Sequence, residues 1–164
     1  MAALFDGRGG PKPCWCMLWR QGPDGKRAPD KAPERRAAMQ GLVEKGRAVG
    51  LLGYDGATPV AWVSIAPRAL FDASLSPQPD QPGLWSLTCF FIRADHRRQS
   101  GFAALLAAAE SHARAAGATA IEAYPVDPDS PSYRFAGFVP SFEKAGYVAV
   151  GRVGQRRHIL RKAL

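Results

Sequence analysis

One segment, residues 84–126, constrains the fold of this chain more than any other. It starts with Leu84–Ile92, a continuous apolar run of strand length that is typical of a strand near the centre of a sheet. A helix follows and ends at Gly117, and Thr119–Val126 has the composition of a second strand. The apolar side of the helix is formed by Phe102, Leu105, Leu106, Ala109, Ala113 and Ala116. Strand, helix and strand in this order predict a βαβ-like unit.

Arginines precede this helix, where they gain no stabilisation from the helix dipole, because its N-terminal end is already positive. Arg93, Arg97 and Arg98 lie just before Gly101 and Phe102. The first N–H groups of a helix are unpaired, and a glycine there lets a ligand approach the backbone closely. Such a helix start binds phosphate or pyrophosphate, and arginines can add bidentate contacts. The stretch therefore predicts a ligand that carries several negative charges.

The composition agrees with one basic domain. The chain has 164 residues, 46% of them hydrophobic, which is enough for a sizeable core. A net charge of +8 and a pI near 9.9 favour an anionic partner: nucleic acid, an acidic lipid surface or a phosphate-rich cofactor. A general bias toward arginine and alanine would give the same charge. No nucleic-acid-binding motif is present, so nucleic acid is disfavoured, and no membrane partner is expected. A homodimer is compatible with the sequence.

Three cysteines, with no secretory or transmembrane run, indicate a reducing cytoplasm. Cys14 and Cys16 are only two residues apart and have no second pair of ligands nearby, so we expect no metal site. Buried thiols are the preferred interpretation.

The remaining elements complete a single domain over residues 14–164, after a flexible N-terminus over residues 1–13. Glycine and proline interrupt the first 13 residues, and Cys14–Arg20 is predicted as a first strand. Further predictions are a helix from Pro33 to near Gly46, a hairpin over 49–67, a short helix over 140–146, and strands over 147–153 and 156–162.

The segment "FFIRADHRRQSGFAALLAAAESHARAAGATAIEA" resembles the acetyl-CoA-binding core of the GNAT (Gcn5-related) N-acetyltransferases. The family signature is Arg or Gln, two residues, Gly, one residue, then Gly or Ala; Arg98, Gly101 and Ala103 match it. "FEKAGY" also matches a segment of the family. The resemblance implies an α/β (α+β) fold: a mixed, mostly antiparallel sheet of six to seven strands, flanked by helices, with a splayed central strand pair.

The resemblance also implies an acetyl-CoA site. The backbone of Phe91 and Ile92 would pair with the pantetheine amides, and the start of the helix would hold the pyrophosphate. The cofactor-binding residues at the helix start would be Arg97, Arg98, Gln99, Ser100, Gly101, Phe102 and Ala103. Counting back from Leu105 and Leu106, the family's usual register places its glycine at Ser100 and not at Gly101, so both registers stay open.

The activity that the resemblance implies is transfer of acetyl from acetyl-CoA to a primary amine of a small molecule or peptide. The family often has a tyrosine, as general acid, where this chain has Phe142. Glu122 and Tyr124 lie on one face of a predicted strand, so they are the candidate base and acid. A structural pairing of Glu122 with an arginine is the alternative, and Cys89 is expected to be a core residue. A catalytically decayed acyl-CoA-binding module is the second functional hypothesis, and a basic nucleic-acid-binding domain is the third.

Overall fold

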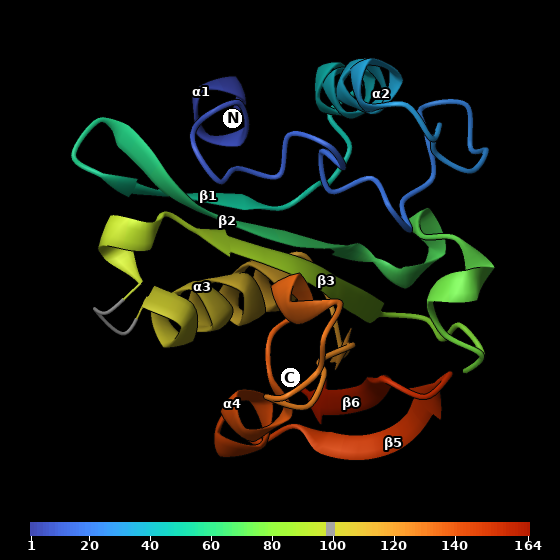
Figure 1. Cartoon of the computed structure of the whole chain (residues 1–164). Helices are drawn as coiled ribbons and strands as arrows, with labels where there is room; N and C mark the ends of the chain where they lie inside the picture. Colours follow the sequence, from blue (N-terminus) through green and yellow to red (C-terminus); the bar gives the residue numbers. More distant parts are fainter. Residues whose placement is uncertain (98–100) are drawn as a thin grey trace.

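The computed structural model describes residues 1–97 and 101–164 of the chain. Within these residues, six strands form one mixed sheet, and helices cover both of its faces (Figure 1). The strands are β1 (Leu51–Asp55), β2 (Thr58–Pro67), β3 (Leu84–Ile92), β4 (Ala120–Ala123), β5 (Val148–Val153) and β6 (Arg157–Ala163). The α-helices are α1 (Ala2–Phe5), α2 (Ala32–Glu44), α3 (Gly101–Ala115) and α4 (Val139–Lys144).

The spatial order of the strands is β1-β2-β3-β4-β6-β5. Neighbours pair antiparallel except β3 and β4, which are parallel and joined by α3. This confirms the predicted βαβ unit and the mixed, mostly antiparallel sheet. The predicted hairpin over 49–67, which turns at Asp55 and Gly56, the short helix α4 and the two late strands are also confirmed.

The sheet separates two apolar layers. On one face, α3 and α4 contribute Leu105, Leu106 and Phe142 to a core with strand residues such as Val63 and Leu87. On the other face, α1 and α2 pack Phe5 and Met39 against Trp62 and Cys89. Trp62 and Val63 are consecutive in β2, so the pleat of the strand assigns them to opposite layers. Figure 1 shows α1 and α2 above the sheet and α3 and α4 below it.

Two N-terminal predictions differ from the structure. Residues 1–13, expected to lack regular structure, contain the helix α1, whose Leu4 and Phe5 are buried. Burial in the second core layer stabilises this short helix, which has no periodicity of its own to reveal it. Cys14–Arg20 is a series of turns and not a strand, because Trp15 and Cys16 have positive φ angles of 46° and 53°. None of the helices in the described residues has the length and apolar composition needed to span a membrane.

Candidate functional site

The pairing of the two central parallel strands stops halfway along β3. Their ladder runs from Leu84↔Ala120 to Leu87↔Ala123, whereas β3 continues to Ile92. A β-bulge marks the same point, since the register with β2 shifts between Ser64 and Ile65 and leaves Thr88 as the extra residue. The Thr88 hydroxyl donates a 3.0 Å hydrogen bond to Ser64 and fixes the bulge. The second half of β3 therefore has an edge that is not paired with β4, as expected of a splayed strand pair.

Backbone direction decides which residues face this open edge. The N–H of Arg93 donates to Val60 of β2, so by alternation Phe91 also faces β2, and Ile92 faces the open edge. The Ile92 carbonyl accepts a 2.9 Å hydrogen bond there from the Arg97 Nε. Of the two residues predicted to pair with pantetheine, Ile92 has its backbone on the open side in this structure, and Phe91 does not.

The segment that follows β4 borders the gap between the splayed strands. Past the end of β4, the N–H of Val126 donates to the Gly137 carbonyl, and the Val126 carbonyl accepts from Val139. This pairing places the 3-10 helix η4 (Arg134–Ala136) against β3 (Figure 1). Gly137 has φ 86° and ψ −179°, which only glycine adopts readily. An added Cβ would lie 2.8 Å from Phe142 and 3.2 Å from Phe102.

A groove of about 490 Å³ runs between α3 and α4 beside the helix start. Four of the predicted cofactor residues line it: Arg97, Gly101, Phe102 and Ala103. Two further cations line it from other elements. Lys144 comes from α4, and Lys162 comes from β6. Glu110 on the groove wall pairs with Lys162 at 2.8 Å, so Arg97 and Lys144 keep the groove positively charged.

Neither lysine was predicted as a site residue from the sequence. They are 18 residues apart on elements that meet only in the folded sheet, so no sequence spacing connects them. Arg98, Gln99 and Ser100 lie outside the described residues, and their predicted phosphate contacts stay predictions. Gly101 opens α3. Its ideal Cβ would lie in ordinary contact, 3.4 Å from the Ile92 side chain.

Glu122 and Tyr124 are brought together, as the strand alternation predicted, at the point where β3 and β4 separate. The Tyr124 hydroxyl donates a 2.8 Å hydrogen bond to Oε1 of Glu122 and lies 2.8 Å from the Ser86 hydroxyl. Oε2 of Glu122 accepts a 2.7 Å hydrogen bond from Arg161 of β6. Both Glu122 and Tyr124 are fully buried. Burial, followed by the charge of Glu122, raises the pKa of Tyr124 above its usual range, so the phenol keeps its proton.

Phe142 and Cys89 have apolar surroundings. The Phe142 ring is fully buried and packs against Phe90, Phe102 and Tyr147, with centroid distances between 5.2 and 5.9 Å. Cys89 is buried in the second core layer, where it accepts an S–H hydrogen bond from Cys16 at 3.2 Å. Cys89 therefore lies in the core, as expected. Among residues 1–97 and 101–164, no three His, Cys, Asp or Glu side chains are arranged as metal ligands.

A mixed six-stranded sheet, splayed after a bulge and followed by a helix that opens on a basic groove, defines the class of GNAT-type folds. The family model of the acetyltransferase (GNAT) family matches residues 13–138, and the chain belongs to this family. A search of the curated proteins finds no match.

Solved structures show the same fold at low sequence identity. A protein of Desulfovibrio desulfuricans assigned to the GNAT acetyltransferases is 16% identical, with a TM-score of 0.57 over 82% of each chain. The PaiA N-acetyltransferase of Thermoplasma acidophilum, solved with coenzyme A, is 11% identical, with a TM-score of 0.56 over 80% of this chain and 71% of that one. Ard1 of Thermoplasma volcanium is 12% identical, with a TM-score of 0.54 over 79% of each chain.

Proposed function

We propose that the protein is an N-acetyltransferase that transfers acetyl from acetyl-CoA to a primary amine by direct attack. The observation that carries the proposal is the open edge of β3 beyond Leu87, which leads to the basic groove at the start of α3. An extended amide-containing chain can add to a strand edge, while the cations beside it complement phosphate groups. Membership of the family and the coenzyme A complex of PaiA support the same ligand.

The residues present fit coenzyme A. Arg97 and Lys144 supply positive charge where the phosphates would lie, since Lys162 is paired with Glu110, and the backbone of Ile92 lies at the open edge. Acetyl-CoA supplies an activated thioester, and the protein's part is to orient it and to exclude water. Attack requires a neutral amine, so a proton must leave the ammonium group. Glu122 as base and Tyr124 as acid remain our candidates for the proton steps.

The test has two readouts. A ligand present at about 100 times its dissociation constant adds about 2.7 kcal/mol to the stability of the native state. Acetyl-CoA and CoA should therefore raise the melting temperature by several degrees, and NAD and ATP should do less. A screen of amine acceptors that follows release of the CoA thiol then tests turnover. No shift with millimolar acetyl-CoA, together with a shift with duplex DNA, would replace the proposal by nucleic-acid binding.

A second candidate function is binding of acyl-CoA without catalysis. It is favoured by the position of Phe142, which has no proton to give, and by the burial of Glu122 and Tyr124, whose oxygens are bonded within the protein. A thermal shift with acetyl-CoA, combined with no thiol release for any amine, would select this function over transfer.

A further inference from the structure

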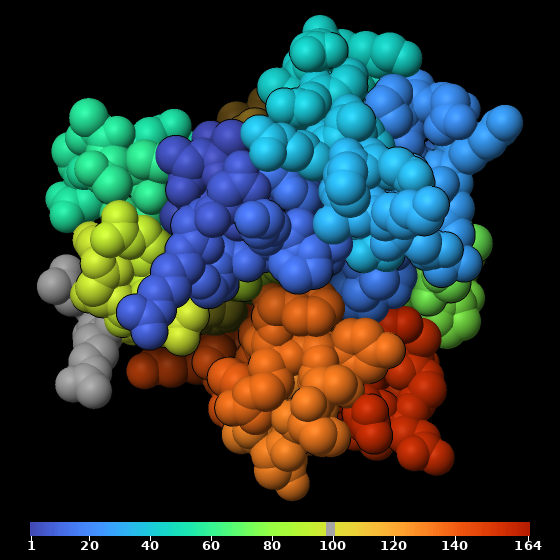
Figure 2. Space-filling model, turned by 45° about the horizontal axis from the view of Figure 1, so that its top comes forward, coloured from blue at the N-terminus to red at the C-terminus, as the bar shows by residue number. Residues whose placement is uncertain are grey.

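A second cavity, of about 640 Å³, lies beside the end of β3 and is bordered by the N-terminal segment. Its lining combines residues that are far apart in the sequence: Gly7–Gly9 of the N-terminal turn, Thr58 and Pro59 of β2, and Arg93, Ala94, Asp95 and Arg97. Figure 2 shows the dark-blue N-terminal segment against the yellow residues around the end of β3 and the start of α3. Arg97 lines both this cavity and the groove between α3 and α4, so the two spaces are adjacent.

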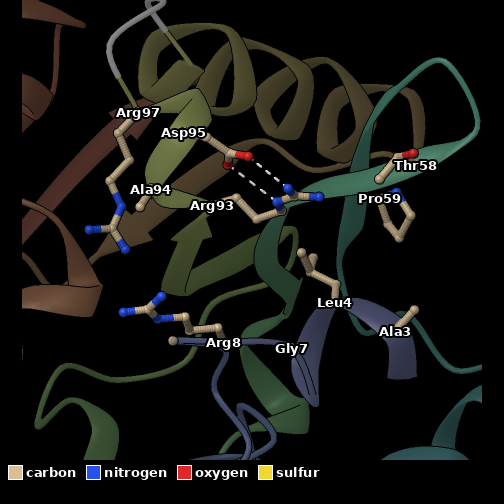
Figure 3. A pocket seen from close by; sticks show the side chains of 11 residues that line it. Ala3, Leu4, Gly7, Arg8, Thr58, Pro59, Arg93, Ala94, Asp95 and Arg97 are labelled. Atoms are coloured by element: carbon tan, nitrogen blue, oxygen red, sulfur yellow. Dashed lines mark hydrogen bonds and ion pairs between the residues drawn. The ribbon is translucent and has the colours of Figure 1, made fainter.

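Three arginines line the cavity, but one of them is already neutralised. Arg93 donates to both oxygens of Asp95, at 3.2 and 2.6 Å, and His96 takes the same carboxylate at 2.9 Å. Within residues 1–97 and 101–164, Arg97 has only the neutral Ile92 carbonyl as a partner, and Arg8 has no hydrogen bond or ion pair. Figure 3 shows the Arg8 and Arg97 guanidinium groups on the same side of the cavity, while Arg93 turns toward Asp95. Arg8 and Arg97 thus face one space, and the carboxylate that also lines it, Asp95, is paired with Arg93 and His96.

Contacts of the neighbouring residues fix the position of Arg8. Leu4 and Phe5 anchor the segment in the core, and Asp6 pairs with Arg36 of α2 at 3.1 Å. A tight turn follows, in which the N–H of Gly10 donates to the Gly7 carbonyl and Gly9 has a φ of 75°. Arg8 is at the tip of this turn. The cation is therefore held at the cavity by the residues on both sides of it, although its own side chain is exposed.

We infer that Arg8 and Arg97 together bind the pyrophosphate group of coenzyme A, with the N-terminal turn as a clasp over the cofactor. The inference rests on the proposed function and adds to it a contact from a part of the chain that the family signature does not include. A doubly charged oxyanion matches two guanidinium groups, each of which can donate in bidentate fashion. Pyrophosphate fits better than the 3′-phosphate because Arg97 immediately adjoins the edge of β3 that the pantetheine arm would follow.

The test compares Arg8→Gln with Arg114→Gln by calorimetric titration of CoA. Arg114 is a suitable control because it is an exposed arginine in the last turn of α3, far from the helix start. We expect Arg8→Gln to raise the Kd for CoA about tenfold, the factor that corresponds to about 1.4 kcal/mol. Arg114→Gln should change the Kd little, Arg8→Lys should lie between, and the melting temperature of the unliganded variants should stay that of the wild type. The difference should shrink as salt is raised, because exposed charges are screened.

Two further ligands separate the outcomes. With 3′-dephospho-CoA the effect of Arg8→Gln should persist at the same size; its disappearance would assign Arg8 to the 3′-phosphate and overturn the inference. Equal CoA affinity of Arg8→Gln and Arg114→Gln would also overturn it, while leaving the proposed function intact. If wild type fails to bind CoA, the proposed function falls. Titration of inorganic pyrophosphate against wild type and Arg8→Gln then decides whether an anion site that depends on Arg8 exists even though the protein does not bind CoA.

Discussion

The phenol of Tyr124 donates a 2.8 Å hydrogen bond to the carboxylate of Glu122, and neither side chain has exposed surface. The pair lies where β3 and β4 separate, with Arg161 on the second carboxylate oxygen. Arg161 thus balances a buried carboxylate, and the phenol of Tyr124 lies where the two strands separate.

Tyr124→Phe should lower the free energy of unfolding by about 1–3 kcal/mol, because Oε1 of Glu122 and the Ser86 hydroxyl each lose a buried partner. Urea unfolding measures this loss. If Tyr124 also acts as the general acid, kcat should fall by about 10²–10⁴-fold at an unchanged Kd for acetyl-CoA. Full kcat in both Tyr124→Phe and Glu122→Gln, assayed well below their melting temperatures, would leave the pair a structural role only.

Phe142→Tyr tests the position at which the family often has an acid. The added hydroxyl enters a fully buried aromatic cluster, so the melting temperature should fall. Turnover below the melting transition should nevertheless not decrease, since the new phenol brings a proton to that position. Steady-state kinetics beside a thermal melt separate the two effects, and a drop in kcat larger than the loss of folded protein would contradict the prediction.

The central part of the fold could be predicted from the sequence because the patterns that indicate it each lie within a short segment. The apolar run of β3, the helical spacing of α3 and the glycine after it are each contained in a short segment. The alternation of Glu122 and Tyr124 was equally local, and their hydrogen bond confirms the shared face. Arg161, which completes that network, is 39 residues from Glu122 and reaches it only through the pairing of β4 with β6.

The N-terminal region could not be predicted in this way. Cys14–Arg20 has the apolar content of a strand, but its buried side chains belong to a loop in which two residues have left-handed backbone geometry. Leu4 and Phe5 form a helix of four residues that only tertiary packing stabilises. The same packing places Arg8 at the cavity beside the end of β3. Nothing in the neighbouring residues of Arg8 indicates that the turn reaches this point.

Gly137→Ala should destabilise the fold by more than a glycine replacement at a surface turn. Its backbone conformation suits glycine alone, and the new Cβ would meet the rings of Phe142 and Phe102. We expect a loss of about 2–4 kcal/mol, combining the backbone strain with overpacking. Gly154→Ala is the matched control: its φ is also positive, at 61°, but a Cβ there meets nothing within 4 Å. Equal losses of stability in the two variants would show that the ring contacts do not matter.

The pKa of His96 should lie above its usual value of about 6.5. The hydrogen bond to Asp95 is the main cause of the shift, and the hydrogen bond to Asp55 is the second. The contact between His96 and Asp95 also lowers the pKa of Asp95 to about 2. Because the folded pKa of His96 is raised, the stabilising contribution is fully present below about pH 6.5 and is lost as the pH rises through the folded pKa. NMR titration should show that Asp95→Asn lowers the pKa of His96 more than Asp55→Asn does. A larger effect of Asp55→Asn would reverse the assignment.

Gly101→Val should raise the Kd for acetyl-CoA far more than it lowers stability. In the structure Gly101 opens α3 with ordinary space for a Cβ, so Gly101→Ala should fold and bind nearly as wild type. The branched valine, in contrast, would crowd a phosphate at the helix start. Titration of acetyl-CoA against Gly101→Val and Ser100→Val compares the two registers of the signature. Normal binding by Gly101→Val and weak binding by Ser100→Val would move the glycine position of the motif to residue 100 and leave the cofactor unchanged.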